Sequence, residues 1–233
     1  RNLTNVEQLT IYMNECKRMG INVLGPDINE SMLQFSANKQ GDVRFGLAAI
    51  KGVGEAAVES IIAERTKNGR FKDIYDFIER VDYSLVNRKC LENIAYAGGY
   101  DSISGFSRCK FFGVDQRDNN GVTYIEQLMR YGQRYQSEKN NAQQSLFGGD
   151  TGTTDITPPV IPACAEWSQL EKLNKEREVI GLYLSAHPLD DYKVIIRNMC
   201  KTQVGDLDHL DELKGKEIAV AGMVVAVQNL TTK

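Results

Sequence analysis

The chain has 233 residues, of which 42% are hydrophobic and 25% charged, and its formal net charge is −3. This composition is typical of a globular protein with one large domain or two small ones, and it excludes a disordered, fibrous or strongly polycationic protein. The five cysteines form no CxxC pair and the two histidines stand at no zinc-binding spacing, so we expect reduced thiols and no structural metal. The longest apolar stretch, 218–227, is too short to span a bilayer, no signal-peptide pattern is present, and a cytoplasmic location is predicted.

The N-terminal part predicts one helix followed by extended chain. Residues 4–7 have the capping-box pattern Thr-Asn-Val-Glu, and apolar residues at helical spacing follow until Gly20. Residues 21–24 are predicted to be extended. Two short apolar segments, 33–35 and 43–45, flank a polar turn, which is typical of a small β-hairpin.

A turn with two glycines follows this hairpin and opens a second helix. Residues 44–62 read RFGLAAIKGVGEAAVESII, in which Gly52-Val53-Gly54 separates a small apolar segment from an amphipathic run that ends at Gly69. The first amides of a helix lack partners within the helix and lie at the positive end of its dipole. Because glycines let a ligand approach the backbone closely, this turn is a candidate phosphate site.

Three interpretations of the turn compete. Gly52, Gly54 and Ala57 satisfy the GxGxxA pattern of dinucleotide-binding proteins, but the residues before the turn are not a β-branched strand. The second interpretation is a tight turn between helices that binds nothing. The third is a helix-hairpin-helix, whose glycine, apolar, glycine turn holds one nucleic-acid phosphate by its amides, and the segment around Gly52 closely resembles that element.

A further pair of helices is predicted directly downstream. Residues 73–81 and 87–97 have helical period and are closed by two glycines, which resembles the degenerate second hairpin of a tandem unit. No glycine, apolar, glycine turn recurs there, so phosphate binding by the second hairpin is doubtful. Residues 51–110 contain ten basic and nine acidic residues, which predicts weak binding to duplex DNA. The locally basic run 65–72 could add cations beside the first turn.

The middle of the chain predicts a third helix and then a linker. Helical period is legible over 125–135, whereas 136–144 is almost wholly polar and is interpreted as an exposed tail. Residues 148–160 are rich in glycine, threonine and proline, a linker composition.

A short apolar motif lies between that tail and the linker. Residues 143–147 read QQSLF, and two large apolar side chains in a polar, glycine-flanked segment are predicted to be exposed. QxxLF resembles the peptide by which bacterial replication proteins hold the ring-shaped sliding clamp, with Gln143 as the polar anchor and Leu146 with Phe147 as the apolar plug. Burying each of the two would stabilise the complex by about 1.5 to 3 kcal/mol, which leaves an affinity on the order of micromolar after ordering costs.

The C-terminal part predicts one more helix and a strand. Apolar spacing over 166–183 favours a helix, and His187 before a proline is interpreted as a capping or packing residue rather than a catalyst. Residues 218–225 have the pattern of a β-strand whose partners are missing. The chain is therefore interpreted as an excised piece of a longer protein.

Four segments, taken in order, resemble one known family. They read NECKRMGINVLGPDINES, RFGLAAIKGVGEAAVESII, QQSLF and EREVIGLYLSAHPLDDY, and together they resemble the alpha subunit of bacterial replicative DNA polymerase III, a C-family polymerase. The resemblance covers essentially the whole chain. It implies a mainly α fold with minor β, divided into the end of the fingers region at 1–38, a tandem helix-hairpin-helix at 39–115, a helical clamp-binding region at 116–210 with a linker near 148–160, and the truncated start of an OB fold at 211–233.

This resemblance implies a processivity module. Its expected partners are double-stranded DNA, bound weakly and without sequence preference, the sliding clamp (the beta subunit) and other subunits of the replication holoenzyme, with no membrane contact. The family's catalytic carboxylates, which hold magnesium in the parent polymerase, lie upstream, so no cofactor and no nucleotidyl transfer are expected here. The site residues implied are Lys51, Gly52, Val53 and Gly54 for DNA, and Gln143, Ser145, Leu146 and Phe147 for the clamp. The alternative is a fragment of a repair or recombination protein that uses the same hairpin and clamp peptide.

Overall fold

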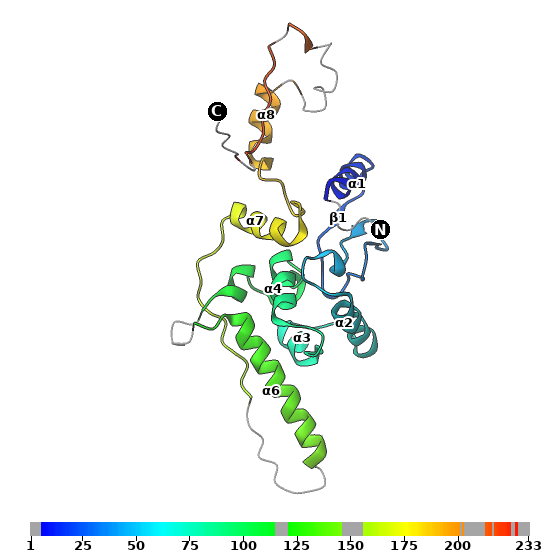
Figure 1. The fold of residues 1–233 in the computed structure, drawn as a ribbon, viewed down its shortest axis with the longest axis vertical. Helices are drawn as coiled ribbons and strands as arrows, with labels where there is room; N and C mark the ends of the chain where they lie inside the picture. Colours follow the sequence, from blue (N-terminus) through cyan, green and yellow to red (C-terminus); the bar gives the residue numbers. More distant parts are fainter. Residues whose placement is uncertain are drawn as a thin grey trace, which may run out of the picture. The chain divides into compact units, whose positions relative to one another are not determined.

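The computed structural model describes residues 6–114, 121–145, 156–200, 202, 213–215, 217–224 and 227 (Figure 1). The chain divides into two compact units, Arg1–Ser185 and Ala186–Lys233, and each is described by itself. The described residues are mainly helical with one small sheet, which confirms the predicted fold class.

A short helix and a three-stranded sheet begin the first unit. Helix α1 (Val6–Arg18) confirms the first predicted helix. The sheet has the strand order β1-β3-β2, in which β1 (Val23–Leu24) runs parallel and β2 (Ser36–Ala37) antiparallel to β3 (Val43–Arg44). The capping residues predicted at 4 and 5 lie outside the described residues.

The predicted hairpin is the β2–β3 pair, and its first strand begins later than expected. Leu33 and Phe35 pack against the hydrophobic core instead of pairing, so the strand starts at Ser36. The side-chain oxygen of Asn38 then accepts the amides of Gln40 (3.0 Å) and Asp42 (2.8 Å) and closes the turn. Such Asx turns explain why asparagine and aspartate favour this position.

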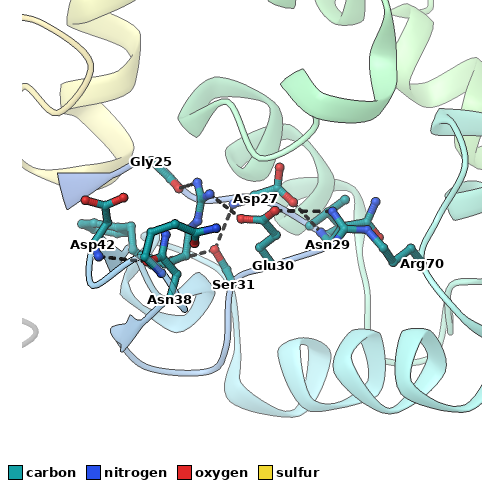
Figure 2. Close-up of polar contacts among 12 residues, drawn as sticks. Gly25, Asp27, Asn29, Glu30, Ser31, Asn38, Asp42 and Arg70 are labelled. Atoms are coloured by element: carbon teal, nitrogen blue, oxygen red, sulfur yellow. Dashed lines mark hydrogen bonds and ion pairs between the residues drawn. The ribbon is translucent and has the colours of Figure 1, made fainter. Parts of the chain in front are cut away.

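A network of hydrogen bonds and ion pairs connects the sheet and the segment between β1 and β2 to the backbone at Phe71, in the loop after the second helix (Figure 2). Arg44 donates to the carbonyl of Gly25 at 2.8 Å and forms an ion pair with Glu30. The carboxamide of Asn29 exchanges two hydrogen bonds with the backbone of Phe71, each 2.8 Å long. Segments about 40 residues apart in sequence are thereby held in fixed register.

Helices of the next segment enclose the core of the unit, which includes Phe45, Val58, Phe77 and Ile94. Side chains set their starts, because Asp73 accepts the amide of Asp76 and Asn87 that of Cys90. These ends confirm the helices predicted downstream of the glycine turn. The elements are η1 (Leu47–Ala49), α2 (Glu55–Asn68), α3 (Ile74–Arg80) and α4 (Arg88–Ala97).

The remaining helices of the unit cover this core. Helix α6 packs against α3 and α4, and α7 packs against α4 (Figure 1). Ser168 forms a capping box with Glu171 at the start of α7, so the sequence specifies that start locally. The elements are α5 (Asp101–Ser104), η2 (Arg108–Phe112), α6 (Tyr124–Ser145) and α7 (Gln169–Ile180).

Helix α6 is longer than the sequence predicts. The prediction that the helix frays over 136–144 is wrong, since α6 continues through Ser145, whereas the predicted exposure is confirmed at Ser137, Lys139, Asn140 and Asn141. One physical reason is that its polar residues are mostly good helix formers. Another is that the Gln136 side chain donates to the backbone carbonyls of Glu79 (3.1 Å) and Val81 (2.8 Å).

The chain from residue 156 onward packs on the unit before it enters α7. Ile156 contacts the core, and Pro162 lies against Gly113, where a Cβ would come within 2.8 Å of it. The Trp167 ring stacks near those of Phe112 and Tyr96, at centroid distances of 5.6 and 6.0 Å. The predicted linker therefore ends in a packed segment, and its residues 148–155 lie outside the described residues.

A buried carboxylate fixes the end of the first unit. Glu176 of α7 is fully buried, and its carboxylate accepts the amides of Leu184 (2.9 Å) and Ser185 (2.8 Å). Arg108 donates to the same carboxylate at 3.2 Å. A buried charge needs such partners, and here they hold the turn after α7 in place.

The second unit is described over a short helical region. A 3-10 turn, η3 (Asp190–Tyr192), leads into α8 (Lys193–Met199). The Asp190 carboxylate accepts the amide of His187 at 2.7 Å, and His187 Nδ1 accepts that of Leu189 at 3.2 Å, so His187 takes part in a local turn before η3, whose N-cap is Leu189. The strand predicted at 218–225 is absent over 217–224, where the described residues offer it no pairing strand.

Candidate nucleic-acid interface

The two-glycine turn joins η1 to α2 and has a backbone that glycine alone adopts readily. Gly52 has φ +75°, in the left-handed region. Val53 is buried, and its amide donates to the carbonyl of Ile50 at 3.1 Å. Gly54 is extended and forms the N-cap of α2. Val53 thus anchors the turn in the core, while Gly52 and Gly54 are exposed on either side of it.

The turn is supported from behind by two other helices. The amide of Lys51 donates to the carbonyl of Val179 in α7 at 2.9 Å. The Asn93 side chain of α4 donates to the carbonyl of Lys51, and a Cβ on Gly52 would come within 2.8 Å of that same nitrogen. Sequence reasoning missed both supports. The signal for Asn93 was a polar residue on the otherwise apolar face of α4.

The start of α2 offers free amides to solvent. Gly54 provides no side-chain cap, and Glu55 and Ala56 in the first turn are exposed. Among the helices α3, α4 and α7, by contrast, each start is capped by a side chain of the chain itself. Unpaired first-turn amides at the positive end of a helix dipole attract an anion. The exposed carboxylate of Glu55 limits the net positive charge at this end.

Two lysines flank the turn. Lys51 is exposed, and the Lys89 side chain of α4 passes within 3.4 Å of the position that a Cβ on Gly52 would take. Neither lysine has an ion-pair partner within the described part of the chain. Sequence reasoning missed Lys89, because its proximity to the turn depends on how α4 packs.

The basic run 65–72 lies at the other end of α2. Ten steps of about 1.5 Å separate Glu55 from Arg65, where the run begins, so about 15 Å or more lies between the run and the turn. Arg65 donates to the carbonyls of Ile28 (2.6 Å) and Ser31 (2.5 Å), and Arg70 pairs with Glu30 at 3.5 Å. The run therefore does not cluster beside the turn, which the sequence left open as a possibility, and its two arginines contact the segment between β1 and β2.

The turn of the second hairpin, residues 81–87, is closed by its own side chains. The Asp82 carboxylate accepts both the amide (2.9 Å) and the hydroxyl (2.6 Å) of Ser84. These hydrogen bonds hold the pKa of the Asp82 carboxyl below its usual value. The amide of Ser84 is thus taken by Asp82 and that of Cys90, at the start of α4, by Asn87, which agrees with the doubt about phosphate binding by this hairpin.

The clamp peptide is only partly within the described chain. Gln143 and Ser145 belong to the last turn of α6 by their backbone. Their side chains, together with Leu146 and Phe147, lie outside the described residues. The exposure of the apolar pair therefore stays a prediction.

Other kinds of site find no support in the described residues. The segment before the turn is the 3-10 helix η1 and the element after α2 is helix α3, so the strands of a dinucleotide-binding unit are missing there. No group of three or more His, Cys, Asp or Glu residues in the described ranges could hold a metal ion. No helix within those ranges is both long and apolar enough to cross a membrane.

Comparison with known proteins finds similarity to a helix-hairpin-helix family model and to DNA polymerase III alpha subunits. Residues 20–111 match the family model described as a helix-hairpin-helix motif. The chain is 31% identical over 231 residues to DNA polymerase III subunit alpha of Vibrio cholerae, and 32% and 36% identical over 232 residues to the proteins of that name from Escherichia coli and Neisseria meningitidis. Each match covers 99% of this chain and 18–19% of the relative, so the chain spans about a fifth of the length of these curated relatives.

Proposed function

Since this chain is homologous to one segment of the DNA polymerase III alpha subunits, we propose that it is the part of such a polymerase that holds duplex DNA and the sliding clamp. The observation that carries the proposal is the uncapped, exposed turn at Gly52 and Gly54 inside a region that matches a helix-hairpin-helix model. The polymerase reaction itself belongs to carboxylates and magnesium elsewhere in the parent protein. This segment would extend the time that the enzyme stays on its template.

The amides of Gly52, Gly54 and Glu55 bind one phosphate of the DNA backbone in this proposal. Val53 contributes its side chain as an anchor, because its own amide is already bonded to Ile50. Lys51 and Lys89 add positive charge on two sides of the phosphate. Since only a few phosphates are neutralised, binding is weak, independent of sequence and strongly salt-dependent.

The peptide at 143–147 gives the second contact. Gln143 forms the polar anchor, Leu146 and Phe147 fill an apolar pocket of the clamp, and Ser145 lies between them. Because α6 carries the start of the peptide at its C-terminal end, the clamp and the DNA contact are tethered through one helix. The second contact then becomes intramolecular, and the effective local concentration of each partner is high.

The homology favours a polymerase over a repair or recombination protein. The matches extend over 99% of the chain and so include the region around His187, which a shared hairpin and clamp peptide alone would not explain.

A single substitution tests the DNA contact. Gly54→Asp places a carboxylate on the first-turn amides of α2, and there is room for it because a Cβ at Gly54 meets nothing within 4 Å. We expect duplex affinity, measured by fluorescence anisotropy, to fall about tenfold and the salt slope to shrink by about 0.9. The free energy of unfolding should stay equal or rise by a few tenths of a kcal/mol, because aspartate is a good N-cap.

The matched control for this test is Gly54→Ala. It adds a Cβ but no acceptor, and φ at this position is −76°, which alanine adopts without strain. Duplex affinity of the alanine variant should stay within about twofold of the original, since its amides remain open. Equal duplex affinity of the aspartate and alanine variants would show that the turn does not bind DNA.

A second pair of variants tests the clamp contact. Leu146→Ala with Phe147→Ala should lower affinity for an isolated sliding clamp by more than tenfold in surface plasmon resonance, because about 3 kcal/mol or more of apolar burial is lost. The control is Ile11→Ala with Tyr12→Ala, which removes an adjacent aliphatic and aromatic pair that is 63% and 55% exposed. Unchanged clamp affinity of the Leu146 and Phe147 double variant would show that the peptide does not bind the clamp.

A further inference from the structure

A groove that contains two arginines lies between α6 and residues 156–159. The volume of this groove is about 420 Å³.

Side chains from one face of α6 form one wall, and residues 156–159 form the other. The residues that line the groove include Gln127, Arg130, Tyr131, Arg134, Thr157 and Pro159.

Residues 156–159, which form the second wall of the groove, are held in place by two tyrosines and by the hydrophobic core. The hydroxyls of Tyr75 and Tyr124 lie 2.9 Å apart, and they approach the carbonyl of Pro159 at 3.4 and 3.5 Å. Ile156 packs against the hydrophobic core at the start of the same segment. The wall is therefore attached at both of its ends.

The groove carries uncompensated positive charge. Arg130 and Arg134 are exposed, stand four residues apart on α6, and have no ion-pair partner among the residues that the structure describes. Their Cβ atoms are therefore about 6 Å apart on one helix face. Glu138, one turn further along α6, has an interaction of its own.

Two carboxylates close to this part of α6, Glu126 one turn before Arg130 and Glu79 beside Tyr131, are engaged elsewhere. Glu126 pairs with Arg88 and accepts the amide of Thr123 at 3.1 Å. Glu79 accepts the hydroxyl of Tyr131, and burial together with this carboxylate raises the pKa of that hydroxyl. Tyr131 thus stays neutral and contributes its ring to the wall of the groove.

We propose that this groove is a phosphate-binding site, in which Arg130 and Arg134 clamp one phosphate group and Gln127 and Thr157 supply neutral hydrogen bonds. Guanidinium groups bind phosphate oxygens in pairs, and two of them at this spacing suit a tetrahedral anion with several oxygens better than a flat carboxylate. The phosphate comes either from a nucleic-acid backbone, in which case the inference rests on the proposed function, or from a free phosphate compound.

The test uses the 233-residue chain and two probes, a labelled DNA duplex and inorganic pyrophosphate. Arg130→Gln with Arg134→Gln should lower affinity for at least one probe about tenfold, by anisotropy for the duplex and by calorimetry for pyrophosphate. The control is Lys17→Gln with Lys139→Gln, which removes the same charge from exposed positions outside the groove. Circular dichroism shows whether each variant is folded.

Each outcome has one meaning. Loss of duplex affinity with a salt slope smaller by about 1.8 identifies nucleic acid as the source of the phosphate. Loss of pyrophosphate binding alone identifies a free phosphate compound. Affinities equal to those of the lysine control for both probes overturn the proposal. Gly54→Asp separates this result from the proposed function, since that variant alters the hairpin turn and leaves the groove unchanged.

Discussion

The two hairpin turns of the first unit differ in what their backbone amides contact. The turn at Gly52–Gly54 leaves the start of α2 without a side-chain cap, whereas the turn at 81–87 is closed by Asp82, and Asn87 caps α4. Both turns join helices in the same core. Helix arrangement alone therefore does not make an anion site, and the side chains of the turn decide whether its amides are available.

The largest effect on stability is expected from adding a side chain at Gly52. Gly52→Ala forces a side chain into the left-handed region at φ +75° and within 2.8 Å of Asn93. We expect the free energy of unfolding to fall by about 2 kcal/mol, measured by urea denaturation. Gly54→Ala is the control, because it adds the same atom in open space. Equal stability of the two variants would contradict the special geometry of Gly52.

Removing the support behind the first turn should have a smaller effect. Asn93→Ala deletes the donor to the Lys51 carbonyl, and we expect a loss of about 1 to 2 kcal/mol of stability together with weaker duplex binding. Asn140→Ala, at an exposed position of α6, is the control. If duplex affinity in the Asn93 variant stayed unchanged, the support would serve stability alone.

The smallest effect is expected at the second turn. The folded-state pKa of Asp82 is lowered, so its charge contributes stability above the unfolded pKa near about 3.9, and this contribution is lost as pH falls through the folded pKa. Asp82→Asn keeps the acceptor and removes the charge. We expect it to be a few tenths of a kcal/mol less stable at pH 6, because Asp82 is exposed, and to match the original at low pH. A difference that persists at low pH would contradict this account.

The sequence predicted those parts of the fold that depend on neighbouring residues. Asp73, Asn87 and Gly69 mark helix ends by local capping and turn chemistry, and the helices begin and end there. The length of α6 was missed, because the contact of Gln136 with the end of α3 is tertiary. The strand predicted at 218–225 without partners does not form over 218–224, because pairing, rather than local pattern, makes a strand.

The candidate site was predictable only in part. The glycine turn is a local motif, and the structure has a turn at the predicted place, whereas its role as a binding site stays a prediction. Lys89 and Asn93 reach the turn through the packing of α4, and no local pattern distinguishes them from other polar helix residues. The charge of the basic run 65–72 is visible in the sequence, but its distance from the turn is visible only in the structure.

The hydrogen bond from Lys51 to Val179 sets a limit on how small a working piece of this protein can be. The family model ends at residue 111, yet the acceptor for the Lys51 amide lies in α7, near residue 180. A protein truncated after residue 111 would contain the whole matched motif and lack this brace. Anyone trimming the chain for crystallisation or binding work should therefore cut beyond α7 and its closing turn.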